Sequence, residues 1–171
     1  LPRKLIRSGN LYHASVADQH VLQEECKLKT VIDLRDQTER NEKPDAVMKG
    51  VEYYYIPMSD EELISDSPES VLGMLQSDGM LHQVLDYDGD IEKLLEQQYE
   101  NFVKDQYCVK QCARFIDVLL HHGNGAVLWH CSWGKDRVGV TTALLLCILG
   151  VHRDVIREDF IRSNVYLAGE L

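Results

Sequence analysis

The chain has 171 residues, about one domain's worth, and its 44% hydrophobic content is enough to supply a folded core. Lys and Arg number 18 against 28 Asp and Glu, which gives a net charge of −10. Nucleic acids and anionic membrane surfaces are held by clustered basic charge, so the composition argues against both as partners. The longest stretch without a charged residue, Val138 to His152, is shorter than the roughly 20 apolar residues of a bilayer span, so no integral membrane association is expected.

The cysteine content indicates a reducing compartment. The five cysteines are odd in number and lack the spacing of a small disulfide framework. A cytoplasmic protein is therefore expected. The sequence starts at Leu1 rather than at Met, so we also expect that a preceding segment has been trimmed. Secretion from a longer precursor therefore stays an alternative to the cytoplasm.

The first third of the chain alternates between helix and strand signals. Ser15 and Asp18 have the spacing of a capping box, which predicts a helix over 16–27. A β-branched run predicts a strand over 30–34, and aromatic and β-branched residues predict a second strand over 51–57. The polar segment between these two strands is expected to be a turn region.

The rest of the chain is richer in helical patterns. Residues 59–106 are acidic and helical, and we interpret them as a helical insertion. Helical spacing of apolar residues predicts a helix over 109–120, and a short apolar strand follows at 126–129. Residues 138–149 are apolar almost all round, which predicts a buried helix, and 153–163 form an amphipathic one. Together the elements predict an α/β fold with a small, mostly parallel sheet flanked by helices.

The pattern Cys-x5-Arg occurs three times, as Cys108 to Arg114, Cys131 to Arg137 and Cys147 to Arg153. The first copy lies within one continuous helical pattern, and the third lies at the end of the predicted buried helix. Only the middle copy follows an apolar strand and precedes a helix. It alone can form a loop whose successive backbone N–H groups surround an anion at a helix N-terminus.

The middle copy combines a nucleophile with an anion site. The positive field of the loop amides and the helix end favours thiolate over thiol, which would make Cys131 a nucleophile at neutral pH. Arg137, in the first helical turn, can offer two parallel N–H donors to two phosphoryl oxygens. These residues predict a phosphate-binding loop that contains a reactive cysteine.

This loop resembles the His-Cys-x5-Arg signature of the cysteine-dependent protein tyrosine phosphatase superfamily, and it is most similar to the bacterial branch with a Cys-x-x-Gly-Lys-Asp-Arg loop. The matching residues are His130-Cys131-Ser132-Trp133-Gly134-Lys135-Asp136-Arg137 and Gly139. Further agreement is found in Arg7 to Tyr12, Val31 to Arg35, Glu39, Pro44-Asp45 and Leu149 to Val151. The resemblance implies one domain over residues 1–171, with 59–106 as a helical insertion or lid.

The resemblance also implies catalytic roles. Cys131 would attack phosphorus and form a phosphocysteine, and Arg137 would bind the phosphoryl oxygens and the charge of the transition state. Asp136 would be the general acid that protonates the leaving group. Much of the superfamily instead carries its acid some tens of residues before the cysteine, where this chain offers Asp86, Asp88, Asp90 and Asp105.

Substrate binding is expected from the loop residues Ser132, Trp133, Gly134 and Lys135. Trp133 would form a wall of the pocket, or else pack against the lid. Lys135 would meet a second phosphate or a substrate carboxylate, or else be a solvated side chain.

Supporting roles are implied for two further residues. His130 would orient the loop and support the thiolate. Asp33, at the carboxyl end of the first predicted strand, would orient Arg137, or else cap the following turn. His121 and His122 lack zinc-site spacing, so neither a metal nor another cofactor is expected.

One position departs from the family pattern. The residue after the arginine is usually Thr or Ser, whose hydroxyl can hydrogen-bond the departing thiolate, and here it is Val138. We expect breakdown of the phosphocysteine to be slower as a result. Thr141 or Thr142, one turn further on, could replace the hydroxyl only in part.

The expected function is therefore phosphomonoester hydrolysis, with phosphotyrosine proteins as the main substrate class. A phosphoinositide or inositol-phosphate phosphatase would use the same catalytic residues. A rhodanese-type sulfurtransferase also places a cysteine among backbone amides, but the x5 spacing and Arg137 argue against it. Val138 leaves open a module that binds phosphate with little turnover.

Overall fold

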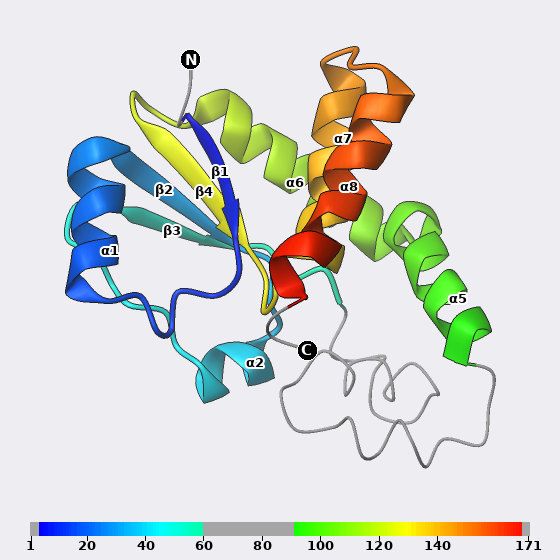
Figure 1. Ribbon diagram of the computed structural model, residues 1–171, viewed down its shortest axis with the longest axis horizontal. Helices are drawn as coiled ribbons and strands as arrows, with labels where there is room; N and C mark the ends of the chain where they lie inside the picture. The colour runs from blue at the N-terminus through cyan, green and yellow to red at the C-terminus, as the bar shows by residue number, and fades with distance from the viewer. Residues whose placement is uncertain (1–3, 60–90, 169–171) are drawn as a thin grey trace.

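A computed structural model describes residues 4–59 and 91–168 of the chain. Its centre is a four-stranded sheet in the order β1-β4-β2-β3, in which every neighbouring pair is parallel (Figure 1). The strands are β1 Leu5–Ser8, β2 Leu28–Asp33, β3 Glu52–Tyr55 and β4 Ala126–His130. The predicted α/β fold with a mainly parallel sheet is thus confirmed.

Helices cover both faces of the sheet. A short pair, α1 and the π-helical turn η1, lies on one face, and α5 to α8 lie on the other (Figure 1). No helix within the described ranges is long and apolar enough to span a membrane. The helices are α1 Val16–His20, η1 Val21–Glu25, α2 Gln37–Glu42, α5 Ile91–Lys104, α6 Gln106–His121, α7 Asp136–Ile148 and α8 Arg153–Leu167.

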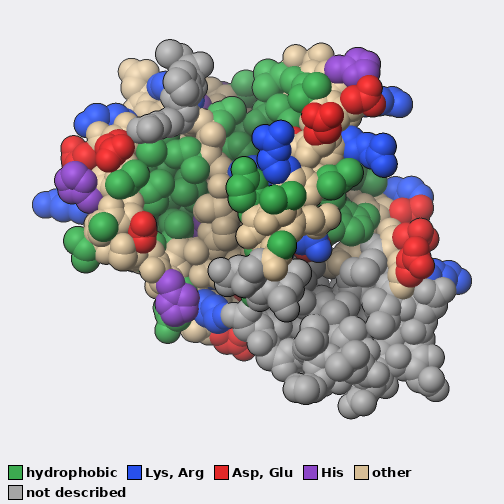
Figure 2. Space-filling view, viewed as in Figure 1, with side chains coloured by type: hydrophobic (Ala, Val, Ile, Leu, Met, Phe, Trp, Pro, Cys, Tyr) green, Lys and Arg blue, Asp and Glu red, His purple; other side chains and the backbone are tan. Residues whose placement is uncertain are grey.

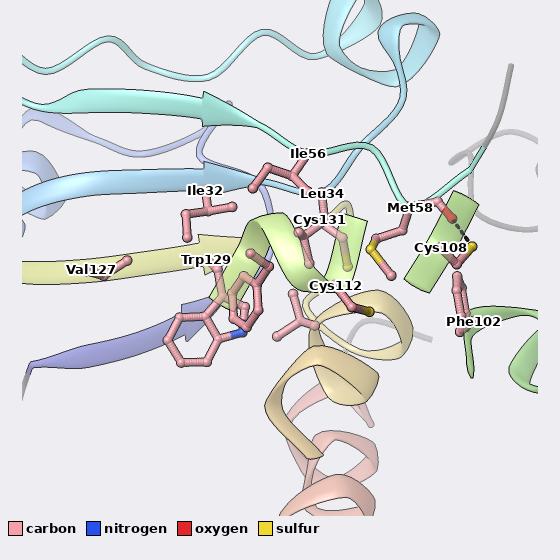
Figure 3. Close-up of a cluster of buried hydrophobic side chains, with 12 residues drawn as sticks. Ile32, Leu34, Ile56, Met58, Phe102, Cys108, Cys112, Val127, Trp129 and Cys131 are labelled. Atoms are coloured by element: carbon pink, nitrogen blue, oxygen red, sulfur yellow. Dashed lines mark hydrogen bonds between the residues drawn. The ribbon is translucent and has the colours of Figure 1, made fainter. Parts of the chain in front are cut away.

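Alternating residues of the central strands belong to two hydrophobic clusters, one on each face of the sheet. Val31 and Leu128 join the cluster beneath α1 and η1. Their sequence neighbours, such as Ile32 and Trp129, face the other side, because successive side chains of a strand point to opposite faces. Figure 3 shows this larger cluster, in which Cys131 lies among side chains from the sheet and from the helices. Cys131 therefore belongs to the larger of these two hydrophobic clusters.

Several predicted elements have different bounds in the structure. The helix expected over 16–27 begins with the predicted capping box but is divided into α1 and η1, and Lys27 has a positive φ of 57°. The segment expected to be only a turn region contains α2. Of the expected insertion 59–106, α5 is helical as predicted, whereas residues 60–90 lie outside the described part of the chain.

Two expectations need correction. Strand β1 was not expected, because its four residues at the sheet edge include only two apolar side chains. The helix α7 was expected to be buried throughout, but only its first half is. Ile148 and Leu149 are 59% and 63% exposed, and Figure 2 shows hydrophobic side chains at the surface where α7 turns into α8.

Candidate active site

The Cys-x5-Arg loop lies at the carboxyl edge of the sheet. Strand β4 lies between β1 and β2 and ends at His130. The next residue is Cys131, whose side chain is buried. Helix α7 begins at Asp136, so the loop spans the gap between a strand end and a helix start. The first N–H groups of a helix have no partner within it and carry partial positive charge, which makes this junction a site for an anion.

Strand β1 and the residues after it bind the carbonyl groups of the loop. The backbone N–H and the Nδ2 of Asn10 donate to the carbonyl oxygen of Ser132 at 3.1 and 3.0 Å. Arg7 Nη2 donates to the carbonyl oxygen of Gly134 at 3.2 Å. Because the C=O and the following N–H of a trans peptide point in opposite directions, these contacts turn the amides of Trp133 and Lys135 to the opposite side of the loop.

Gly134 makes this close approach possible. Its φ of +68° lies in the left-handed region, and a Cβ there would stand 2.5 Å from the carbonyl carbon and oxygen of Ser8. No other residue could occupy this place without a shift of the backbone. The glycine predicted to bind substrate thus also allows β1 to support the loop.

Arg137 is buried and is held by Glu39. Its Nη1 and Nη2 donate to Oε2 and Oε1 of Glu39 at 2.6 and 2.7 Å, and the hydroxyl of Ser132 donates to the same carboxylate. Burial by itself would raise the pKa of Glu39, but the hydrogen bond and charge of Arg137 lower it to about 2. The expectation that Asp33 orients Arg137 is therefore wrong: the orienting carboxylate comes from α2.

Asp33 instead belongs to a buried charge cluster behind the loop. It accepts from Nε and Nη2 of Arg35 at 2.9 and 2.8 Å. The same guanidinium lies 3.0 Å from Asp45 Oδ1, and Asp45 Oδ2 lies 2.9 Å from His130 Nε2. Asp33, Asp45 and His130 bring ligand atoms within 4.8 Å of one another, a grouping that could hold a metal ion, but Arg35 already supplies a cation to both carboxylates.

The other ring nitrogen of His130 faces the loop. Nδ1 lies 3.2 Å from the carbonyl oxygen of Cys131 and 3.8 Å from Asp33 Oδ1. The ring is fully buried, and its partners fix its orientation against the peptide that follows Cys131. This geometry supports the predicted orienting role of His130.

One guanidinium nitrogen of Arg137, Nε, is left without a partner in the described part of the chain. Two of its guanidinium nitrogens are engaged by Glu39, whereas the buried Nε has no hydrogen-bond acceptor in the described part of the chain. A buried unpaired donor costs about 1–3 kcal/mol. An anion bound in the loop would satisfy it.

A match to the sequence model of the tyrosine phosphatase family extends over residues 2–171. The chain belongs to this family. Among its relatives is the triple specificity protein phosphatase PtpB of Mycobacterium tuberculosis, which is 27% identical over 176 residues and matches 95% of this chain. A tyrosine-protein phosphatase of Nostoc commune is 26% identical over 167 residues and matches 96% of this chain. The chain spans 62% and 50% of the lengths of these two proteins.

The fold of the family is also seen in a solved structure. The core catalytic domain of the PP-IP phosphatase Siw14 from S. cerevisiae, in complex with citrate, superposes with a TM-score of 0.50. The match covers 94% of this chain and 70% of the other, at 15% sequence identity. At this identity the likeness concerns the fold alone.

The remaining loop residues of this family member are half-buried. Ser132, Trp133, Gly134 and Lys135 all lie at the boundary between core and surface, and Lys135 is the N-cap residue of α7. Asp136 is half-buried as well, and it accepts a hydrogen bond from the hydroxyl of Tyr99 in α5. No sequence pattern predicts this partner of the proposed acid.

The position that departs from the family pattern, Val138, is completely buried. The two hydroxyls that were expected to compensate in part are engaged elsewhere. Thr141 Oγ1 donates to the carbonyl of Arg137 at 2.9 Å, and Thr142 Oγ1 donates to that of Val138 at 2.6 Å. Neither hydroxyl proton is free to bind the thiolate without breaking a bond to its own helix.

The two other Cys-x5-Arg copies do not form anion sites. Cys108 lies inside α6, and its Sγ donates to the carbonyl of Met58 at 3.2 Å, as the dashed line in Figure 3 shows. Burial, with the charge of Asp105, raises the pKa of Cys108 to about 12. Cys147 is exposed near the end of α7. Context separated the three copies correctly, although Cys147 was wrongly expected to be buried.

The sequence reasoning assigned no role to two site residues, Glu39, which was noted only as part of the family resemblance, and Tyr99. Glu39 stands three residues after Asp36 in a capping-box pattern, which the structure forms at the start of α2. That pattern could have revealed α2, but not that the carboxylate reaches Arg137. Tyr99 lies in a region that was interpreted only as an insertion, and no local signal marks it.

Proposed function

We propose that this chain hydrolyses phosphomonoesters, above all phosphotyrosine in proteins, through a phosphocysteine intermediate on Cys131. The observation that carries the proposal is the arrangement of Arg137, which is clamped by Glu39 and keeps its buried Nε without an acceptor. A phosphoryl oxygen is an acceptor of the right charge. Family membership over residues 2–171 supports the same chemistry within one domain.

In the first step, the Cys131 thiolate attacks phosphorus in line with the leaving oxygen. The S–P bond forms as the P–O bond breaks, and its electron pair stays with the leaving oxygen. Asp136 supplies the proton that this oxygen needs. Arg137 and the loop amides stabilise the charge on the non-bridging oxygens.

In the second step, water hydrolyses the phosphocysteine. The carboxylate of Asp136 accepts a proton from the attacking water, and the S–P bond breaks with its electron pair returning to sulfur. The N-terminal end of α7 stabilises the departing thiolate. Asp105, one of the alternative acids, caps α6 by accepting from the amide of Cys108 at 3.0 Å; the others, Asp86, Asp88 and Asp90, lie outside the described residues.

The test is replacement of the nucleophile. Cys131→Ser should abolish hydrolysis of a phosphotyrosine peptide but keep binding of inorganic phosphate, measured by calorimetry, because the amides and Arg137 remain. Cys108→Ser and Cys147→Ser are matched controls from the two other copies of the pattern and should keep most activity if folded. Near-normal hydrolysis by Cys131→Ser would exclude the mechanism.

A second candidate substrate class is phosphoinositides or inositol phosphates, and Lys135 at the N-cap of α7 favours it. If its ammonium binds a second phosphate, Lys135→Ala should lower kcat/KM for multiply phosphorylated inositides. The loss should correspond to about 1.5–3 kcal/mol of transition-state stabilisation, and the loss for phosphotyrosine should be far smaller. Equal losses on both substrates would argue against this class.

The proposal also includes a location: we propose that the protein works in a reducing compartment such as the cytoplasm. All five cysteines are free thiols, and the mechanism requires Cys131 in its reduced form.

A further inference from the structure

Tyr99 connects α5 to the start of the catalytic loop's helix. Its hydroxyl donates to Oδ1 of Asp136, a residue 37 positions later in the sequence. We propose that Tyr99 is a positioning residue that fixes the carboxyl group of Asp136 for proton transfer to the leaving group. This inference rests on the proposed role of Asp136 as general acid.

The tyrosine ring packs against side chains of two helices. It packs edge-to-face on Phe102 of α5 and on Phe160 of α8, with centroid distances of 6.2 and 6.0 Å. Phe160 in turn lies against the bare backbone of α7 at Gly139, where a Cβ would stand 2.6 Å from its Cε2 atom. A chain of contacts thus fixes the hydroxyl relative to the helix that carries Asp136.

The phenol is held in its protonated form. Burial is the main reason that the pKa of Tyr99 is raised, and the hydrogen bond to Asp136 and its negative charge raise it further. A negative charge on Cys131 would raise the pKa of Tyr99 further. Tyr99 therefore remains a hydrogen-bond donor throughout the working pH range, and it does not itself lose a proton during catalysis.

A fixed donor on one carboxyl oxygen decides which oxygen carries the acid proton. With Oδ1 accepting from Tyr99, the proton resides on Oδ2. As the P–O bond breaks, that proton passes from Oδ2 to the leaving oxygen and Asp136 becomes a carboxylate. The Tyr99 hydrogen bond strengthens as this charge develops, so it contributes more in the transition state than in the ground state.

The test compares leaving groups. Tyr99→Phe removes only the hydroxyl and keeps the ring contacts. We expect kcat/KM to fall about tenfold or more for a phosphotyrosine peptide, and less than about twofold for an activated aryl phosphate whose leaving group departs without a proton. The ratio kcat/KM is the correct measure because it reports formation of the phosphocysteine. Asp136→Asn should show the same selectivity, and adding Tyr99→Phe to it should cause no further loss.

Tyr54→Phe is the matched control. Tyr54 also donates to a carboxylate, that of Glu52 at 3.3 Å, but on exposed β3. This variant should leave kcat/KM unchanged for both the phosphotyrosine peptide and the activated aryl phosphate.

The inference is overturned if Tyr99→Phe slows both substrates equally, slows neither, or remains additive in the Asp136→Asn background. Each of these results would mean that the Tyr99 hydroxyl does not position Asp136 for proton transfer. Failure of the underlying proposal looks different: Asp136→Asn would then show no dependence on the leaving group, or Cys131→Ser would remain active.

Discussion

Val138 is the residue at which this chain departs from its family's loop pattern. It is buried in the same core cluster as Cys131. The nearby Thr141 and Thr142 hydroxyls already donate to backbone carbonyls of α7. A valine side chain cannot donate a hydrogen bond to sulfur, so the departing thiolate lacks a donor that would strengthen as charge returns to it.

Breakdown of the phosphocysteine is therefore expected to limit turnover. Rapid mixing should show a burst of leaving group close to one equivalent per site. Val138→Thr should raise steady-state kcat roughly tenfold if the new bond contributes about 1.4 kcal/mol.

Val138→Ala is the control, since it removes methyl groups without adding a donor and should not raise kcat. No burst and an unchanged kcat in Val138→Thr would mean that the first step is limiting. Phosphate binding without burst or turnover would favour the binding-module alternative.

Among the elements, β1 and the loop meet at Gly134. The left-handed conformation alone costs a non-glycine residue about 1–2 kcal/mol. At Gly134 a Cβ would also collide with the backbone of Ser8, whereas at Gly150, with a similar φ of +73°, no heavy atom lies within 4 Å. A substitution at Gly150 therefore introduces backbone strain alone, whereas one at Gly134 introduces both backbone strain and a steric clash.

We predict that Gly134→Ala displaces the loop and lowers kcat/KM by about a hundredfold, since small misplacements of catalytic groups have effects of that order. Gly150→Ala should lose about 1 kcal/mol of stability in urea unfolding and keep its activity. Equal activity of the two variants would show that β1 does not set the loop conformation.

Helix α2 illustrates how a short element can supply a catalytic partner. Its capping box joins Asp36 and Glu39 through hydrogen bonds of both side chains to backbone amides. The capping box, together with Arg137, therefore fixes the carboxylate that clamps the guanidinium.

At the scale of the whole molecule, the pair Glu39–Arg137 couples stability to pH. The pKa of Glu39 is lowered in the folded state to about 2 from 4.5. A lowered pKa contributes stability that is fully present above the unfolded value and is lost as the pH falls toward the folded one. The free energy of unfolding is therefore expected to decrease between about pH 4.5 and 2.

Glu39→Gln should be less stable at pH 7 by about 3–5 kcal/mol, because it leaves a buried guanidinium unpaired, and should lose less stability on acidification. Glu100→Gln is the control: its salt bridge to Lys104 is 2.7 Å long, but both side chains are more than 60% exposed. It should change stability by less than about 1 kcal/mol. Parallel pH profiles of wild type and Glu39→Gln, by chemical denaturation, would contradict the assignment.

The sequence alone determined the strand–loop–helix unit around Cys131, and with it the α/β class and the candidate nucleophile and arginine. The expectations for the fold class and for this strand–loop–helix unit are confirmed because they depend on contiguous residues, whose local patterns of apolar spacing and helix starts remain valid in the fold. The same holds for the capping box at Ser15, for the end of α6 and for the start of α8.

Only the tertiary structure decided what surrounds that unit. Arg137 and Glu39 are 98 residues apart, Asp136 and Tyr99 are 37 apart, and Asn10 and Ser132 are 122 apart. Asp33 ends β2 and Glu39 follows shortly after it, and no local pattern indicates which carboxylate turns toward Arg137. Glu39 is the carboxylate that binds Arg137 because Asp33 is already paired with Arg35 and because α2 leaves the sheet in a direction that brings Glu39 to Arg137. Contacts between distant segments are set by packing, which a local pattern does not record.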